Sequence, residues 1–187
     1  THNLGAVPEM MWVKRRDGAD RPWYVYHKNL DTSNPAHKYL QLNETSGVAD
    51  STGFWNDTAP TSSVFTVGDD NGINGNTSKY IAYLFATVAG VSKVGSFTAT
   101  GNTINVDCGF SNGAAFILMK RVDSTTFGWA VWDSTRGIVS GNDPYSLIND
   151  TSVEVTNTDY VDPLSSGFTV SNSFYSAGTW LFYAIAA

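Results

Sequence analysis

The sequence predicts an all-β fold, a β-sandwich or jelly roll, and three observations support this class. Helical periodicity is nearly absent from the 187 residues. Short runs rich in Val, Ile, Phe, Tyr, Trp and Thr recur instead, which is the composition of strands. Clusters of Gly, Asn, Asp, Ser and Pro separate these runs and supply the residues that turns require. About a dozen short strands at this spacing are typical of a sandwich.

The predicted strands follow one another along the whole chain. Apolar runs define the strands at 10–15, 80–85, 116–120 and 179–185, and shorter or alternating runs define the others. In order, the strands cover residues 10–15, 23–27, 39–42, 63–67, 80–85, 92–98, 103–107, 116–120, 128–132, 146–148, 168–170 and 179–185. The turn residues Thr100-Gly101-Asn102 predict a hairpin between the sixth and seventh of these strands.

A comparison of the chain with itself indicates a tandem duplication. Met10-Met-Trp-Val-Lys-Arg-Arg-Asp17 aligns with Phe116-Ile-Leu-Met-Lys-Arg-Val-Asp123 at an offset of 106. Four further blocks keep the same order: 23–26 with 129–132, 39–46 with 145–152, 65–67 with 168–170, and 80–86 with 180–186. The offset falls from 106 to 103 and then to 100, and both shifts occur in polar, turn-rich stretches where β folds tolerate deletions.

The duplication predicts how the domain is organised. We expect one all-β domain over residues 1–187, with repeat 1 at about 7–86, a linking hairpin at 87–113 and repeat 2 at about 114–187. Each repeat supplies only about five short strands, which are too few to close a core comfortably alone. We therefore expect the halves to pack into one pseudo-twofold sandwich or into two docked lobes.

Composition excludes several classes of function. The net charge is −6, which argues against binding the phosphate backbone of nucleic acid. No run approaches the ~20 apolar residues that cross a bilayer, so membrane insertion is not expected. A single cysteine, Cys108, excludes an internal disulfide framework and a multi-cysteine metal site. Only 15% of residues are charged, so hydroxyls and amides form most of the polar surface.

The second half contains sequence segments that resemble a repeat of bacteriophage virion proteins. They are Val94-Gly-Ser-Phe-Thr-Ala-Thr-Gly101, Cys108-Gly-Phe-Ser-Asn-Gly113 and the segments at 117–123, 129–133, 136–145 and 158–168. Such repeats occur in tail-fibre-like and other structural proteins of phages that infect marine and cyanobacterial hosts. The resemblance implies a virion component and no reaction. The chain departs from the family pattern in its short loop at 172–178.

Residues with catalytic chemistry form no recognisable motif, so we expect no enzymatic activity. Gly-x-Ser-x-Gly and His-Glu-x-x-His are absent from the sequence. His27 aligns with Asp133 of the other repeat, which favours a solvated strand end over a catalytic base. Asp69-Asp70, Asp159 and Asp162 lie in turn-rich stretches, where a turn-forming role is favoured over the carboxylate pair of a glycosidase.

No cofactor or metal is expected, although one loop leaves calcium open. Gly68-Asp-Asp-Asn-Gly-Ile-Asn-Gly75 offers oxygen donors in a flexible turn. Ile73 stands where an EF-hand requires an oxygen ligand, so a hairpin loop is the favoured interpretation.

Three residues are the candidates for binding. Trp55 follows a polar stretch and has no aligned partner in the other repeat. Exposure, for stacking on a sugar or for a subunit contact, and burial in a loop are equally favoured. Tyr26 is the second aromatic candidate, and His37 lies in segment 30–38, which differs between the repeats as segment 51–60 does. Such differing positions are where we expect contacts with a partner.

Two basic pairs recur at equivalent positions. Lys14-Arg15 and Lys120-Arg121 are each followed two residues later by an aspartate, Asp17 or Asp123. We expect ion pairs that support the strand ends, which is favoured over a clamp for a receptor or a neighbouring subunit.

Taken with the resemblance, the sequence predicts a non-enzymatic virion structural protein, a tail-fibre or adhesin domain that recognises a host surface. A capsid decoration or head-fibre protein is one alternative, and a lectin-like or glycan-cleaving module is the other. The expected partners are further copies of the chain, other virion proteins and a host surface glycan. A homotrimer is expected by analogy with phage fibres.

Overall fold

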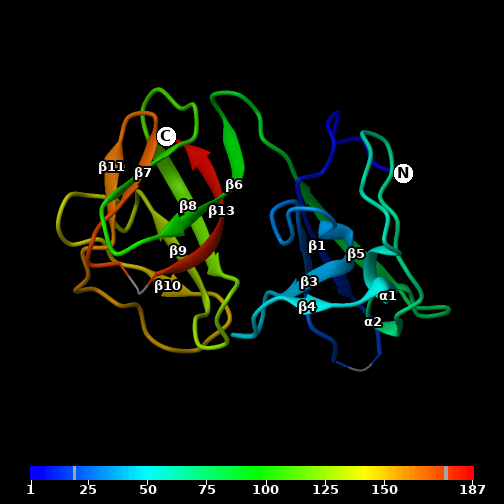
Figure 1. Cartoon of the computed structure of the whole chain (residues 1–187). Helices are drawn as coiled ribbons and strands as arrows, with labels where there is room; N and C mark the ends of the chain where they lie inside the picture. The colour runs from blue at the N-terminus through cyan, green and yellow to red at the C-terminus, as the bar shows by residue number, and fades with distance from the viewer. Residues whose placement is uncertain (19, 175–176) are drawn as a thin grey trace. The chain divides into compact units, whose positions relative to one another are not determined.

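The computed structural model describes residues 1–18, 20–174 and 177–187. The chain forms two compact units, Thr1–Ala86 (unit 1) and Thr87–Ala187 (unit 2) (Figure 1). Antiparallel sheets dominate both units, so the all-β prediction is confirmed. A single domain over the whole chain stays a prediction. In the loop expected at 172–178, Tyr175 and Ser176 lie outside the described residues.

Unit 1 is built on one five-stranded sheet. Its strands are β1 (Met10–Arg15), β2 (Tyr24–His27), β3 (Lys38–Gln41), β4 (Ala49–Asp50) and β5 (Tyr80–Phe85). They lie in the order β4-β3-β2-β1-β5, and every neighbouring pair is antiparallel.

The described part of unit 1 also contains three short helices. They are the 3-10 helix η1 (Pro35–His37) and the α-helices α1 (Thr52–Trp55) and α2 (Asn71–Asn74). The side chain of Ser51 accepts a hydrogen bond from the amide of Gly53, and that of Asp70 accepts one from Gly72. These contacts satisfy amides that a helix N-terminus leaves without partners.

The core of unit 1 lies between one face of the sheet and the two α-helices. The sheet contributes Met11, Val13, Tyr24 and Tyr26, and the helices contribute Phe54, Trp55 and Ile73. Phe65 and Val67, from the segment between the helices, pack against this cluster. Met11 and Val13 alternate with Met10 and Trp12 along β1, so this cluster takes one of the two apolar faces of the strand.

Unit 2 is a β-sandwich of two sheets. The larger sheet has the order β10-β9-β8-β13-β6, and the smaller has the order β11-β12-β7 (Figure 1). The strands are β6 (Ser92–Ala99), β7 (Ile104–Asp107), β8 (Ala114–Arg121), β9 (Trp129–Asp133), β10 (Ser146–Leu147), β11 (Val161–Leu164), β12 (Gly167–Val170) and β13 (Gly178–Ala186).

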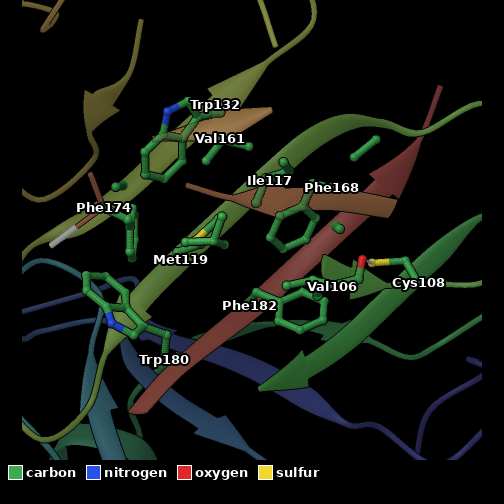
Figure 2. Packing of buried hydrophobic residues seen from close by; sticks show 14 of the residues in the cluster. Val106, Cys108, Ile117, Met119, Trp132, Val161, Phe168, Phe174, Trp180 and Phe182 are labelled. Carbon is green, nitrogen blue, oxygen red and sulfur yellow. Dashed lines mark hydrogen bonds between the residues drawn. The ribbon is translucent and has the colours of Figure 1, made fainter. Parts of the chain in front are cut away.

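Aromatic side chains from both sheets fill the sandwich. Figure 2 shows Phe168 of the smaller sheet facing Phe182 of the larger one, and their ring centroids are 5.4 Å apart in an edge-to-face arrangement. Trp180 and Phe174 extend the same cluster, with centroids 4.7 Å apart (Figure 2). Such pairs add to the stability that burial of apolar area supplies.

Four strands of unit 1 correspond in order and in register to four strands of unit 2. The order β3-β2-β1-β5 in unit 1 is matched by β10-β9-β8-β13 in unit 2. Met11 pairs with Tyr26 and Leu84, and the aligned Ile117 pairs with Trp132 and Ala184. These registers agree with the offsets of 106 and 100 along all four strands. The common ancestry of the halves remains an inference from the sequence.

Two predictions about strands are wrong. Residues 63–67 form no strand, because no neighbouring strand in the described part of unit 1 pairs with them. The sixth and seventh predicted strands form no hairpin, because β6 pairs with β13 in one sheet and β7 with β12 in the other. The turn at Thr100-Gly101-Asn102 therefore carries the chain from one sheet to the other.

The sequence pattern also did not indicate several elements. It did not predict β4, η1, α1 or α2, which are two to four residues long and too short to show a period. It missed β11 as well, where Pro163 lacks the amide that a central strand donates. That strand lies at the edge of its sheet, which is where proline is tolerated. No helix among the described residues has the length and apolar character needed to span a membrane.

Candidate functional site

A polar cluster gathers around His37, where β2 ends and β3 begins. The His37 imidazole lies between two carboxylates: its Nδ1 is 3.7 Å from Oδ1 of Asp50, and its Nε2 is 3.7 Å from Oδ1 of Asp57. About a third of the His37 side chain is exposed (36%), and both aspartates are more open. We call His37, Asp31, Asn34, Lys38, Asp50 and Asp57 the His37 cluster.

One backbone and one side-chain hydrogen bond hold the two loops of this cluster together. The Ser51 amide donates to the carbonyl of His37 at 2.9 Å, which connects the entry to α1 with η1. Asn34 Nδ2 donates to Oδ1 of Asp57. Asp57 follows the last turn of α1 in a left-handed conformation, with φ of 50°, as does Asn56, with φ of 52°. Two consecutive non-glycine residues in this region cost conformational energy, so the surrounding contacts fix the position of the Asp57 carboxylate.

Two carboxylates of the cluster, Asp31 and Asp50, have pKa values below the ordinary value for aspartate. Amide and hydroxyl hydrogen bonds from Asn34 and Ser33 lower the pKa of Asp31 to about 2. The Lys38 ammonium, 2.6 Å from Oδ2 of Asp50, lowers the pKa of that carboxyl, and Asp50 raises the pKa of Lys38 in return. The cluster therefore presents acceptors with net negative charge at neutral pH.

Trp55 and Tyr26 lie next to the His37 cluster, but in the core. Trp55 is 1% exposed and Tyr26 is 3% exposed, so of the two interpretations left open for Trp55 the structure has burial and not exposure. Their rings meet edge to face with centroids 5.8 Å apart, and Trp55 Nε1 donates to the Lys38 carbonyl at 2.9 Å. Helix α1, which the sequence analysis missed, turns Trp55 inward. The structure thus brings the three predicted residues together, with only His37 at the surface.

The chemistry of the cluster suits recognition of a neutral polar ligand. Carboxylates, an amide, an imidazole and an ammonium together offer both donors and acceptors to hydroxyl groups. Within the described residues, no group of three or more His, Cys, Asp or Glu side chains is arranged to hold a metal ion. In the loop at 68–75, Asp70 caps α2 through a 2.6 Å bond from the Gly72 amide, a helix-capping role in place of the predicted hairpin turn.

Comparison with known proteins identifies the family. The whole chain, residues 1–187, matches a family model described as a domain of unknown function, DUF7483. The chain belongs to this family. No curated protein and no solved structure matches the sequence.

In this member of the DUF7483 family, unit 2 has a different residue at the position of His37. The register of β3 and β10 aligns His37 with Asp143, which is fully buried. The Asp143 carboxylate accepts hydrogen bonds from the amides of Tyr160 at 2.7 Å and Val161 at 3.0 Å. Burial nevertheless raises its pKa to about 6. At this shared position, unit 1 thus has a surface side chain, His37. Unit 2 has a buried side chain, Asp143, which supports a loop.

The repeated basic pairs have the predicted supporting role. Arg15 Nε lies 3.1 Å from Oδ1 of Asp17, and Arg121 Nε lies 2.6 Å from Oδ1 of Asp123, so the predicted ion pairs are confirmed. The lysines add equivalent bonds, because Lys14 donates to the Arg21 carbonyl and Lys120 to that of Phe127.

His27 differs from its prediction. It is 1% exposed, and its Nδ1 accepts a hydrogen bond from the Asn29 amide at 3.1 Å. The expectation of a solvated strand end is therefore wrong, because all four residues of β2 are buried.

Sequence reasoning also missed Asp31, Asp50 and Asp57 as members of the candidate site. The available signal was indirect: the two segments that differ between the repeats, 30–38 and 51–60, contain five of the six members of the His37 cluster.

Proposed function

We propose that this chain is a non-enzymatic structural protein of a bacteriophage virion, a tail-fibre or adhesin module that recognises a host surface. Support comes from the resemblance of segments such as 94–101 and 108–113 to virion repeats, and from a surface rich in uncharged polar groups. Hydroxyl and amide groups hydrogen-bond to ligands and limit nonspecific attraction between charges.

The observation that carries the proposal is the location of the His37 cluster. Segments 30–38 and 51–60 differ between the aligned halves, and hydrogen bonds between Asn34 and Asp57 and between Ser51 and His37 join them. Residues needed for the shared fold are expected in both halves, whereas a function carried by one half requires residues found only there. The exposed donors and acceptors of this cluster suit the hydroxyl groups of a host glycan.

The test compares glycan binding by the full chain and two variants. His37→Ala and Asp57→Asn remove donors or acceptors from the cluster, and Asp20→Asn is the matched control. Asp20 is fully exposed and lies between β1 and β2, at the opposite end of the sheet. We expect saturable binding on a glycan array or on host cells, weakened about tenfold or more by the cluster variants and unchanged in the control.

Two outcomes would contradict this assignment. Equal binding by all variants would exclude the cluster as the recognition surface. A stable oligomer that ignores every glycan and every host cell would favour a capsid decoration role. Light scattering on the same sample measures the oligomer, for which a homotrimer is proposed.

A further inference from the structure

Strand β5 lies at the open edge of the sheet in unit 1. Its partner is β1 on one side, and on the other side the described residues of the sheet contribute no strand. The corresponding strand of unit 2, β13, lies between β8 and β6. The two sheets therefore differ at this edge, where unit 2 has an additional strand.

Alternate residues of β5 direct their backbone groups away from β1. The Arg16 amide donates to the Lys79 carbonyl, which places residue 79 in a hydrogen-bonded pair with β1. Residues 81 and 83 share that orientation, so the amides and carbonyls of Tyr80, Ala82 and Leu84 point toward the open edge. In unit 2, Val122 donates to Thr179 in the same way, and residues 180, 182 and 184 face β6.

The sequence of this edge has neither of the residue types, lysine and proline, that commonly protect an edge strand. Tyr80-Ile-Ala-Tyr-Leu-Phe85 contains no charged residue and no proline, and Ala82 and Tyr83 are exposed. Native proteins ordinarily protect such a strand with lysine, proline, a bulge or a covering segment, because an open edge pairs with other chains. The composition of β5 therefore does not block pairing with another strand.

A pocket of 350 Å³ lies beside the same strand. Val13, Phe65, Val67, Ile73, Tyr80 and Ala82 provide its apolar lining, and Thr1 and Asn74 add polar groups. Three of these residues correspond to large side chains in the core of unit 2: Phe65 to Phe168, Tyr80 to Trp180, and Ala82 to Phe182. Figure 2 shows those three rings packed in the sandwich.

In unit 2 the added strand inserts an aromatic side chain among these same three rings. The Phe97 ring of β6 stacks on Trp180 with centroids 6.5 Å apart and an interplanar angle of 6°. Its centroid also lies 6.5 Å from that of Phe168 and 6.3 Å from that of Phe182. The residues that surround Phe97 in unit 2 thus have counterparts that line the pocket in unit 1.

We propose that the β5 edge and its pocket bind an extended segment of a partner protein, which pairs antiparallel with β5 and inserts an aromatic side chain opposite Tyr80. The β6–β13 pair is the pattern for this interaction, since Phe97 lies directly opposite Trp180. Backbone hydrogen bonds supply part of the affinity, and the aromatic pocket supplies specificity. The binding surface is separate from the His37 cluster, so this proposal does not depend on glycan recognition.

The structure also indicates which side chain the partner can carry two positions before its aromatic residue. In unit 2, Gly95 lies opposite Phe182, and an added Cβ at Gly95 would be 2.6 Å from that ring. In unit 1, Ala82 stands in the place of Phe182. This smaller residue leaves room for a side chain on the incoming strand. The partner therefore requires an aromatic residue at one position and tolerates side chains larger than glycine at the other.

A blocked synthetic peptide with the sequence of Ser92–Ala99 is the probe. It is titrated into the full-length chain while backbone amide signals are followed by NMR, with isothermal calorimetry for the dissociation constant. We expect saturable shifts at residues 80–84. Replacing the phenylalanine of the peptide with alanine is expected to weaken binding about tenfold or more, because aromatic anchors dominate such contacts.

Two variants of the chain sharpen the test. Ala82→Pro removes an amide that points outward, so the ladder with β1 and the melting temperature are expected to persist while peptide binding weakens at least tenfold. Ala89→Pro is the matched control in the exposed turn before β6, where the Val91 amide donates to the Val88 carbonyl and proline suits the second turn position. This control is expected to bind the peptide as the unmodified chain does.

Three results would overturn the proposal. The first is an absence of saturable binding at millimolar peptide. The second is equal affinity of the Ala82→Pro variant, judged on a sample whose amide spectrum shows β1 and β5 intact. The third is a set of shifts confined to β8 and β13, which would mean that the peptide replaces β6 in unit 2.

Discussion

The indole Nε1 of Trp55 donates a hydrogen bond to the carbonyl oxygen of Lys38, 2.9 Å away, and so ties α1 to the first residue of β3. The same indole meets the ring of Tyr26 edge to face. One side chain therefore holds together the helix, the sheet and the loops that carry the His37 cluster. Trp55 supports the candidate site from within the core.

Replacing Trp55 should lower the stability of unit 1, because the side chain lies in the core and not at the surface where a ligand would bind. Trp55→Ala removes a side chain that is 1% exposed, and such a cavity costs about 3–5 kcal/mol of unfolding free energy. Trp55→Phe keeps most of the volume but loses the hydrogen bond to Lys38, for about 1–2 kcal/mol. Urea denaturation followed by circular dichroism measures both. Unchanged stability in Trp55→Ala would mean that the indole is not packed as described.

Asp143 should make the stability of unit 2 depend on pH between about 4 and 6. Burial raises its pKa from the ordinary 3.8 to about 6. The folded chain then holds the proton more tightly than the unfolded chain does. The stabilisation is complete below the unfolded pKa and is lost as the pH rises through 6, by about 3 kcal/mol at most.

Asp143→Asn isolates that contribution. Carboxyls with a lowered pKa, such as Asp123 and Asp133, have the opposite effect on stability. The stability that they contribute is lost as the pH falls, and only at lower pH. Melting temperatures at several pH values from 4 to 7 should fall across pH 4–6 in the unmodified chain relative to the variant. Parallel profiles for the two proteins would show that Asp143 does not titrate in this range.

Two aligned asparagines accept hydrogen bonds from equivalent backbone amides. Replacing them should reduce the free energy of unfolding by different amounts. Asn43 Oδ1 accepts a hydrogen bond from the Trp23 amide at 3.0 Å in an exposed setting. Asn149 Oδ1 accepts one from the Trp129 amide at 2.6 Å in a partly buried setting. Asn149→Ala should cost about 1–2 kcal/mol and Asn43→Ala less, since a buried donor loses more when its partner is removed.

Asparagine-to-aspartate changes are the matched controls for this pair. An aspartate at either position keeps the acceptor oxygen, so Asn149→Asp and Asn43→Asp should retain most of the stability in denaturant titrations. An equal loss from alanine and aspartate at position 149 would contradict the role assigned to this hydrogen bond.

Cys108 should be inert to thiol reagents while unit 2 is folded. Its side chain is 5% exposed, and burial raises the pKa of the thiol to about 12, which suppresses the reactive thiolate. Ellman's reagent should therefore react at the rate at which unit 2 opens, and faster in urea. Rapid stoichiometric reaction in native buffer would contradict this burial.

The sequence identified much of the sheet but little of the candidate site. Apolar and aromatic periodicity located most strands, because each strand must bury alternate side chains. It placed His37 in a segment of interest and predicted the pairing of Arg15 with Asp17. It could not show that Asp50 and Asp57 lie on either side of His37, since residues 13 and 20 positions apart meet only through the packing of β4 and α1.

A tripeptide shared by the two halves separates what the sequence determines from what the tertiary structure decides. Phe65-Thr-Val67 and Phe168-Thr-Val170 have the same sequence, and in both the Phe and Val side chains contribute to a core. Their alternation is a local property, so the sequence determines which side chains turn inward. Only Phe168–Val170 lies in a strand, because β11 and β7 pair with both of its edges. A strand requires hydrogen bonds from neighbours distant in the sequence, and the tertiary structure alone supplies them.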